Sequence, residues 1–134
     1  MIIEGKNAIQ VLLEEFVEMK VIHDDSNVDY GCKDIDYYFF ECYFTPFILE
    51  QMQLGNETAL VKIFSFVERL FQFGDDDIKD LANVSIIESL YYDNVCSNFK
   101  PTLLKFCGSQ TLQRFINCLV DDEKLEWNDC LKAA

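Results

Sequence analysis

Residues 57–73 carry the pattern that most constrains how this chain folds. Their apolar side chains recur at positions i, i+3, i+4 and i+7, the spacing of one face of an α-helix, and a second apolar stripe lies beside the first. Gly74 then suits a left-handed helix end, and Asp75 suits the N-cap of a following helix. We therefore expect a helical hairpin whose first arm lies between neighbouring helices.

The second arm of this hairpin is expected over residues 76–92. The residues that helical spacing places in the core are Ile78, Leu81, Ala82, Val84, Ile86, Leu90 and Tyr91. Residues 6–20 predict an amphipathic first helix, and residues 21–31, rich in turn formers, predict an exposed acidic loop. Residues 34–54 predict a helix with a break or kink before Pro46, because the residue before a proline is pushed out of helical conformations.

Shorter helices are expected after the hairpin. They cover residues 101–106, then residues 111–120 with Ser109 as a cap, and a last helix that is capped by Asp121 or Asp122 and holds Leu125, Trp127 and Leu131. The chain of 134 residues has two prolines, five glycines and no alternating strand pattern. We expect an all-α fold with six or seven helices packed as antiparallel hairpins, forming one domain over residues 1–134.

Charge and composition exclude several classes of function. The chain has 24 acidic and 11 basic residues and a formal net charge of -13, so its field repels phosphate backbones and anionic lipids. His23 is the only histidine, and the sequence has no phosphate loop, dinucleotide motif or catalytic triad pattern. We expect a binding module, not an enzyme, with no cofactor and no nucleic-acid or membrane partner.

The cysteines predict a reduced protein. No export signal and no membrane-length apolar run occurs, so we expect a cytoplasmic location, where thiols stay reduced. The spacing lacks Cys-x-x-Cys pairs and does not fit a zinc site. We interpret all six as small buried apolar residues: Cys32, Cys42, Cys96, Cys107, Cys118 and Cys130.

Residues 66–90 carry a resemblance to a known class of proteins. The segments Phe66-Val67-Glu68-Arg69-Leu70, Gly74-Asp75-Asp76-Asp77 and Val84-Ser85-Ile86-Ile87-Glu88-Ser89-Leu90 resemble the F-(I/V)-E-x-L, G-(D/N)-(D/E) and (F/I)-(L/I)-E-x-L pattern of small acidic helical proteins. That class is associated with bacterial toxin-immunity loci, including immunity proteins of contact-dependent and polymorphic toxins. The resemblance implies neutralisation of a toxin by tight binding.

Glu68 and Glu88 depart from the pattern of their helices. Glu88 falls among apolar positions on a helical wheel, and Glu68 lies at the edge of an apolar stripe, so each carboxylate needs a partner. They are open to three interpretations: acceptors for a helix terminus or tyrosine, members of a shared binding pocket with Arg69 or Arg114, or an acid–base pair. We interpret both as structural polar residues, because no nucleophile or metal-ligand set accompanies them.

Acidic residues cluster in four groups, and one of these contains aromatic residues as well. The predicted partner-binding residues are Asp24, Asp25, Asp29, Tyr30, Asp34, Asp36, Tyr37 and Tyr38, since aromatics inside an acidic rim suit an interface. The same segment places Asp25, Asn27, Asp29 and Asp36 at positions 1, 3, 5 and 12 of a calcium loop. Tyr30 stands where that loop needs glycine, which favours a solvated acidic loop.

A basic protein is the partner that this charge predicts, since it turns self-repulsion into attraction. The function we expect is that of an immunity protein which neutralises a cognate toxin by direct binding. The alternative is an acidic adaptor or nucleic-acid mimic that inhibits a basic host protein.

Overall fold

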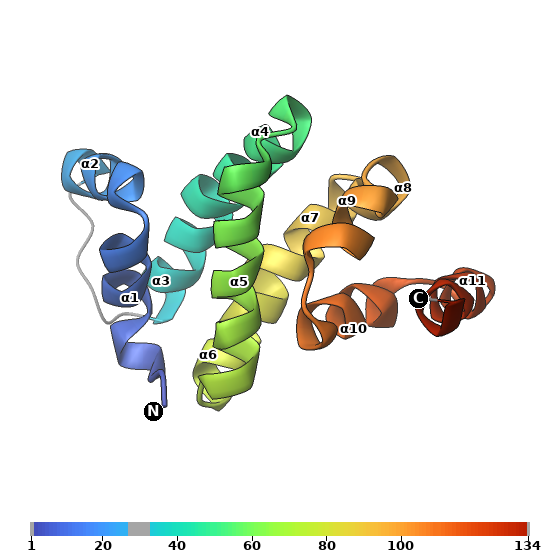
Figure 1. Cartoon of the computed structure of the whole chain (residues 1–134). Coiled ribbons are helices and arrows are strands. Elements are labelled where there is room, and N and C mark those ends of the chain that lie inside the picture. The colour runs from blue at the N-terminus through green and yellow to red at the C-terminus, as the bar shows by residue number, and fades with distance from the viewer. Residues whose placement is uncertain (1, 27–32, 134) are drawn as a thin grey trace.

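The computed structural model describes residues 2–26 and 33–133, and the described residues form an all-α domain (Figure 1). Its elements are the 3-10 turn η1 (Gly5–Asn7), α1 (Ala8–Glu15), α2 (Val17–Ser26), α3 (Lys33–Phe39), the π-helical η2 (Phe40–Phe44), α4 (Thr45–Leu54), α5 (Glu57–Phe73), α6 (Asp76–Leu81), the π-helical η3 (Ala82–Glu88), α7 (Ser89–Tyr92), α8 (Val95–Asn98), α9 (Lys100–Phe106), α10 (Ser109–Cys118) and α11 (Asp121–Ala133). Among the described residues, pairing of the β type is limited to an isolated bridge between Ile3 and Gly74.

The expected hairpin is formed by α5 and the helix that starts at α6. Asp75 caps α6, since its Oδ1 accepts a hydrogen bond of 2.9 Å from the backbone N–H of Ile78. Gly74 does not adopt the left-handed conformation that we expected, because its φ of -74° and ψ of 149° are extended. The N-terminal segment explains the difference: the N–H of Ile3 donates to the Phe73 carbonyl, and the N–H of Asp75 donates to the Ile3 carbonyl.

The first predicted helix is two helices. Phe16 separates α1 from α2 with φ of -121° and ψ of 83°, and its ring enters the core, with centroids 5.2 Å from Phe44 and 5.3 Å from Phe66. Residues 21–26, expected in an exposed loop, continue α2. The rest of that predicted loop, through residue 31, lies outside the described residues.

Residues 33–54 are helical throughout, so of the expected break or kink before Pro46 the break is wrong, and a π-helical turn lies there instead. Thr45 keeps helical φ and ψ of -61° and -45°, and its N–H bonds to the carbonyl of Phe40 five residues earlier. The wider π turn, η2, therefore ends at Phe44, two residues before the proline. Such a turn changes the hydrogen-bond register locally and accommodates a residue that cannot donate, without ending the helix.

Residues 76–92 form a second helix with a π-helical middle, η3. The extra residue in a π turn rotates all later side chains relative to an α-helical wheel. Val84, expected in the core, is 36% exposed, and Ile87, absent from our predicted core, is fully buried. The two π segments contact each other, and the Thr45 hydroxyl donates a buried hydrogen bond of 2.6 Å to the Ser85 carbonyl.

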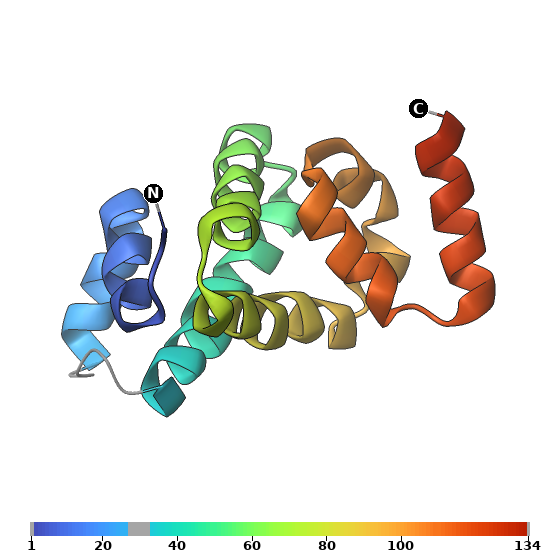
Figure 2. The ribbon, with the colours of Figure 1, turned by 90° about the horizontal axis from the view of Figure 1, so that it is seen from below.

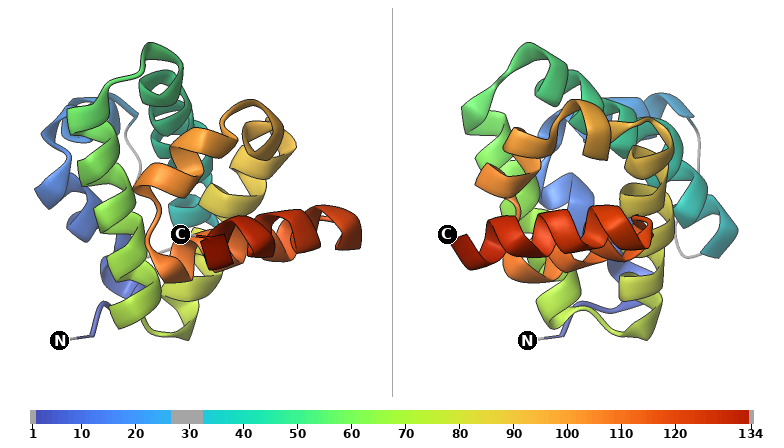
Figure 3. Two further views of the ribbon diagram at one scale, coloured as in Figure 1. Left: turned by 45° about the vertical axis from the view of Figure 1, so that its right-hand side comes forward. Right: turned by 90° about the vertical axis from the view of Figure 1, so that its right-hand side faces the viewer.

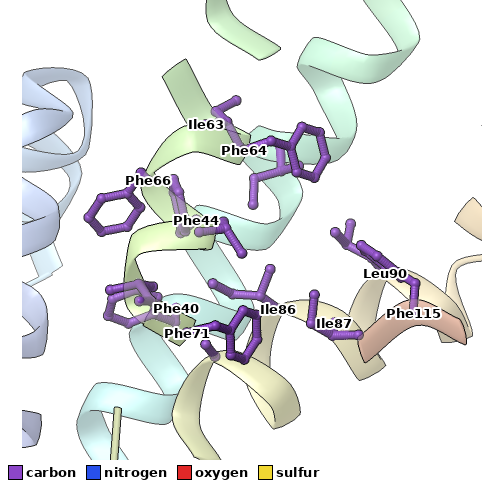
Figure 4. Packing of buried hydrophobic residues seen from close by; sticks show 14 of the residues in the cluster. Phe40, Phe44, Ile63, Phe64, Phe66, Phe71, Ile86, Ile87, Leu90 and Phe115 are labelled. Atoms are coloured by element: carbon purple, nitrogen blue, oxygen red, sulfur yellow. The ribbon is translucent and has the colours of Figure 1, made fainter. Parts of the chain in front are cut away.

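Helix α5 lies in the middle of the core, as its two apolar faces predicted. It contacts α4, α6, η3, α9 and α10, and Figure 4 shows Phe64 and Phe66 projecting from it to different sides. The aromatic rings of Phe40, Phe44 and Phe71 pack beside Ile86 and Ile87 in the same cluster. Burial of such side chains stabilises the fold by roughly 1.5–3 kcal/mol each.

The C-terminal helix lies at the end of the molecule opposite α1 and α2 (Figure 2). Seen from that end, α11 covers α10 (right panel of Figure 3). Trp127 anchors it with 3% exposure, and the Nζ of Lys100 lies 5.4 Å from the centroid of the Trp127 ring. Leu125, in the same helix, is 65% exposed, so Trp127 and not Leu125 packs against the core.

The cysteines whose side chains are described are free thiols, but they do not all lie in the core. Cys96 is buried, Cys107 and Cys118 are half-buried, and Cys42 is exposed on η2, so the interpretation of Cys42 as buried is wrong. The side chains of Cys32 and Cys130 lie outside the described set.

Candidate functional site

Tyr37 connects two acidic regions that are far apart in the sequence. Its hydroxyl, on α3, donates a hydrogen bond to the carboxylate of Asp80 on α6. Burial raises the pKa of the Tyr37 hydroxyl, and the neighbouring carboxylates of Asp80 and Asp77 raise it further. Tyr37 therefore keeps its proton and remains the donor that holds α3 against α6.

The exposed residues around this contact are acidic and aromatic. Tyr38 is 56% exposed, and its ring lies edge-on to Tyr43 with centroids 6.4 Å apart. The residues termed the acidic surface from here on are Tyr37, Tyr38, Glu41, Asp76, Asp77 and Asp80. Tyr37 and Glu41 are one helical turn apart, as are Asp76 and Asp80. Glu41 accepts a hydrogen bond of 3.4 Å from the Ser89 hydroxyl, so it lies toward α7.

The carboxylates of the acidic surface lie away from the ion pairs found among the described side chains. Those pairs join Arg69 to Glu15 at 2.6 Å, Lys105 to Glu57 at 2.6 Å and Lys100 to Glu126 at 3.1 Å. Lys79, half-buried, is the basic residue of α6, and Lys33, whose side chain lies outside the described set, begins α3. The acidic surface therefore has a net negative charge that a cationic partner would complement.

Part of the predicted partner-binding set belongs to this surface. Tyr37 and Tyr38 lie on it, Asp24 and Asp25 are in α2, and Asp34 is in α3. The side chains of these three aspartates lie outside the described set, as do Asp29 and Tyr30 as whole residues.

Asp36 is a predicted partner-binding residue whose side chain is buried. It is 4% exposed, because it shares a helical face with Phe39 and Phe40, which are fully buried in the core. Asp36 therefore exposes little of its side chain to a partner.

The helices α2 and α3 also contain two of the residues of the calcium-loop alternative. Its first position, Asp25, lies within α2, and its last position, Asp36, is buried in α3. Asn27 and Asp29 lie outside the described residues. Within the part of the chain that the structure describes, no group of three or more His, Cys, Asp or Glu side chains is arranged to hold a metal ion.

Glu68 accepts hydrogen bonds from a helix terminus, which was one of the roles left open for it. Its Oε1 accepts from the N–H and the hydroxyl of Thr111, both at 2.8 Å, and its Oε2 accepts from the N–H of Gln110 at 3.1 Å. It thus caps α10 from the neighbouring helix, in place of the expected Ser109. A Cβ on Gly108 would lie within 2.4–2.6 Å of the Glu68 side chain, so this position requires glycine.

Glu88 occupies a different place, so the shared pocket for the two glutamates is not formed. Glu68 lies at the N-terminus of α10, whereas Glu88 lines a hollow of about 260 Å³ with Arg114, Asn117 and Cys118 from the later turns of α10. Burial raises the pKa of the Cys118 thiol, and the carboxylate of Glu88 raises it further.

Sequence reasoning missed the groups that complete these contacts. Thr111 and Gly108 gave no signal as partners of Glu68, because the contact joins helices 42 or more residues apart. Gly108, the N-cap of α10, has no side chain to accept from the first N–H groups of that helix, which indicates only that an acceptor must come from elsewhere. Asp80 is exposed, and its bond to Tyr37 depends on how α3 packs on α6, which local patterns do not show.

Helices of sufficient length and apolarity to cross a membrane are absent from residues 2–26 and 33–133. The fold and the acidic surface define this protein as an acidic all-α domain. It belongs to the family described as a domain of unknown function (DUF7674), whose model matches residues 9–122. The comparison with curated proteins and the comparison with solved structures found no match.

Proposed function

We propose that this domain binds a basic protein through the acidic surface and that the partner is a cognate toxin, which it neutralises by direct binding in the cytoplasm. The observation that carries the proposal is the bond between Tyr37 and Asp80, because it holds the part of α3 that carries the exposed Tyr38 against a carboxylate of α6. The surface combines the exposed ring of Tyr38 with carboxylates that attract a cationic partner.

The chemistry of the surface supports protein binding. Tyrosine supplies a large contact area at low cost in side-chain entropy, and the exposed Tyr38 directly follows Tyr37, whose hydroxyl bonds to the Asp80 carboxylate. A net charge of -13 accelerates encounter with a basic protein. Toxins that cut nucleic acid are commonly basic, and the sequence pattern of residues 66–90 supports this choice of partner.

The test is co-expression with the product of the adjacent gene, followed by co-purification and a growth assay. We expect a basic protein to co-purify and its toxicity to be suppressed. The variant D76K/D77K should lose suppression, whereas D121K/D122K should retain it. Both variants reverse two exposed aspartates in the first turn of a helix, so they change net charge and helix-dipole interactions alike.

The outcomes separate the two candidate functions. Suppressed toxicity that depends on Asp76 and Asp77 supports the immunity proposal. A basic partner without toxicity supports the adaptor or nucleic-acid mimic instead. Equal behaviour of the two double variants contradicts a role for the acidic surface.

A further inference from the structure

Two adjoining hollows lie on either side of a tyrosine pair at the end of η3 and α7. Tyr91 and Tyr92 line both of them, with ring centroids 5.7 Å apart in an edge-on arrangement. The larger hollow, about 260 Å³, adds Glu88 and Arg114, and the smaller one, about 190 Å³, adds Glu123 from α11. The site is thus assembled from helices that are distant in the sequence.

The larger hollow contains one positive and one negative side chain that do not neutralise each other. Glu88 and Arg114 are both half-buried. They are not among the ion pairs that the described side chains form. The guanidinium of Arg114 lies 4.8 Å from the centroid of the Phe71 ring, which fixes its position. The Glu88 carboxylate is near Cys118. Burial is the main cause of the raised pKa of the Cys118 thiol, and the charge of Glu88 adds to it.

This arrangement selects for a ligand that carries both charges. A ligand that is only an anion is repelled by the Glu88 carboxylate, and a ligand that is only a cation is repelled by the Arg114 guanidinium. A molecule with a carboxylate and an ammonium group satisfies both side chains, and the amides of Asn83 and Asn117 supply further donors and acceptors at the same hollow.

We propose that these hollows bind a free basic α-amino acid, arginine or lysine. Its α-carboxylate pairs with Arg114 and its α-ammonium group pairs with Glu88. Its aliphatic stem crosses the tyrosine pair, and its side-chain cation reaches Glu123 in the smaller hollow. Tyrosine faces attract cations, and the net positive charge of the ligand complements a chain of charge -13.

This site is independent of the proposed partner binding, because none of its residues belongs to the acidic surface. Its test therefore uses small molecules and the isolated domain. Isothermal titration calorimetry would compare arginine, lysine, agmatine and glutamate, where agmatine is arginine without its carboxylate. We expect saturable binding of arginine or lysine, at least tenfold weaker binding of agmatine, and no binding of glutamate.

Variants assign the contacts. Glu88→Gln and Glu123→Gln should each weaken arginine binding at least tenfold, whereas Asp129→Asn, which removes an exposed charge from the same helix as Glu123, should leave it unchanged. Arg114→Lys keeps a cation at the carboxylate position and should retain partial binding, with folding checked by thermal melting. The proposal is overturned if neither arginine nor lysine saturates at millimolar concentration, if agmatine binds as tightly as arginine, or if E88Q and E123Q behave like D129N.

Discussion

The carboxylate of Glu68 on α5 caps α10 through Thr111, whose N–H and hydroxyl both donate to the same oxygen at 2.8 Å. The first N–H groups of a helix have no partner within the helix, and they are usually satisfied by the residue that precedes it. Here a side chain from another helix satisfies them. The contact therefore stabilises α10 and fixes its position against α5 at once.

Replacing Glu68 with alanine should destabilise the fold by about 1–2 kcal/mol, since it leaves the half-buried N–H of Thr111 without its acceptor. Urea unfolding followed by circular dichroism measures the change. Glu50→Ala, at an exposed position of α4, is the matched control and should cost less than about 0.5 kcal/mol. Equal losses for the two variants would show that Glu68 is not a cap in solution.

Gly74→Ala should cost about 1–3 kcal/mol because of close packing. An added Cβ would lie 2.2 Å from the Leu70 carbonyl oxygen and 2.3 Å from Cγ2 of Ile78. Gly55 is the informative comparison, since its φ of 65° is left-handed and its Cβ would meet nothing within 4 Å. Asparagine tolerates the left-handed region, so Gly55→Asn should recover stability relative to Gly55→Ala, and Gly74→Asn should not recover relative to Gly74→Ala. Recovery at both positions would argue against the extended turn.

Thr45→Val should destabilise the contact between the two π-helical segments. Valine keeps the shape of threonine but removes the hydroxyl that donates to the Ser85 carbonyl in the core. We expect a loss of about 1–2 kcal/mol in thermal or chemical unfolding. Thr58→Val, on the exposed start of α5, makes the same chemical change and should be nearly neutral. A neutral T45V variant would mean that the hydrogen bond contributes no stability.

Stability should fall at alkaline pH because of buried thiols. Burial raises the pKa of Cys96 from 9.0 to about 12, so the folded chain holds this proton after the unfolded chain has lost it. This contribution is complete below about pH 9 and is lost as the pH rises toward 12, with a slope approaching 1.4 kcal/mol per pH unit, roughly. Unfolding free energies measured at increasing pH above 8 should fall less steeply for Cys96→Ala. Identical slopes for the two proteins would contradict the burial of this thiol.

Local sequence patterns predicted the helices with uninterrupted 3.6-residue periodicity. The bounds of α5 and the cap by Asp75 were predicted from residues 57–77. The apolar stripe of a helix and the aspartate that caps the next helix are local features, which a short stretch of sequence contains. The π turns were not predictable in this way. They arise where residues 33–54 and 76–92 pack on each other, and one extra residue per turn moved Val84 out of the core and Ile87 into it.

The candidate site shows the same division. Tyr37 and Tyr38 were predicted as contact residues from an aromatic and acidic composition, but their carboxylate neighbours come from α6, more than 35 residues later. The expected helix over residues 34–54 includes Asp36, but its burial follows from the packing of the α3 face that also carries Phe39 and Phe40. Contacts between helices determine both the carboxylate neighbours of Tyr37 and the burial of Asp36. A helical wheel of one helix carries no information on such contacts.

The most direct test of the central claim is the rate of association with the co-purified basic partner, measured by stopped flow over a series of salt concentrations. Wild-type protein should associate fast at low salt and slow steeply as salt rises. D76K/D77K should associate about tenfold more slowly at low salt with a flatter salt dependence, whereas D121K/D122K should stay close to wild type. Equal rates for the two variants, or a wild-type rate that does not depend on salt, would contradict binding through the acidic surface.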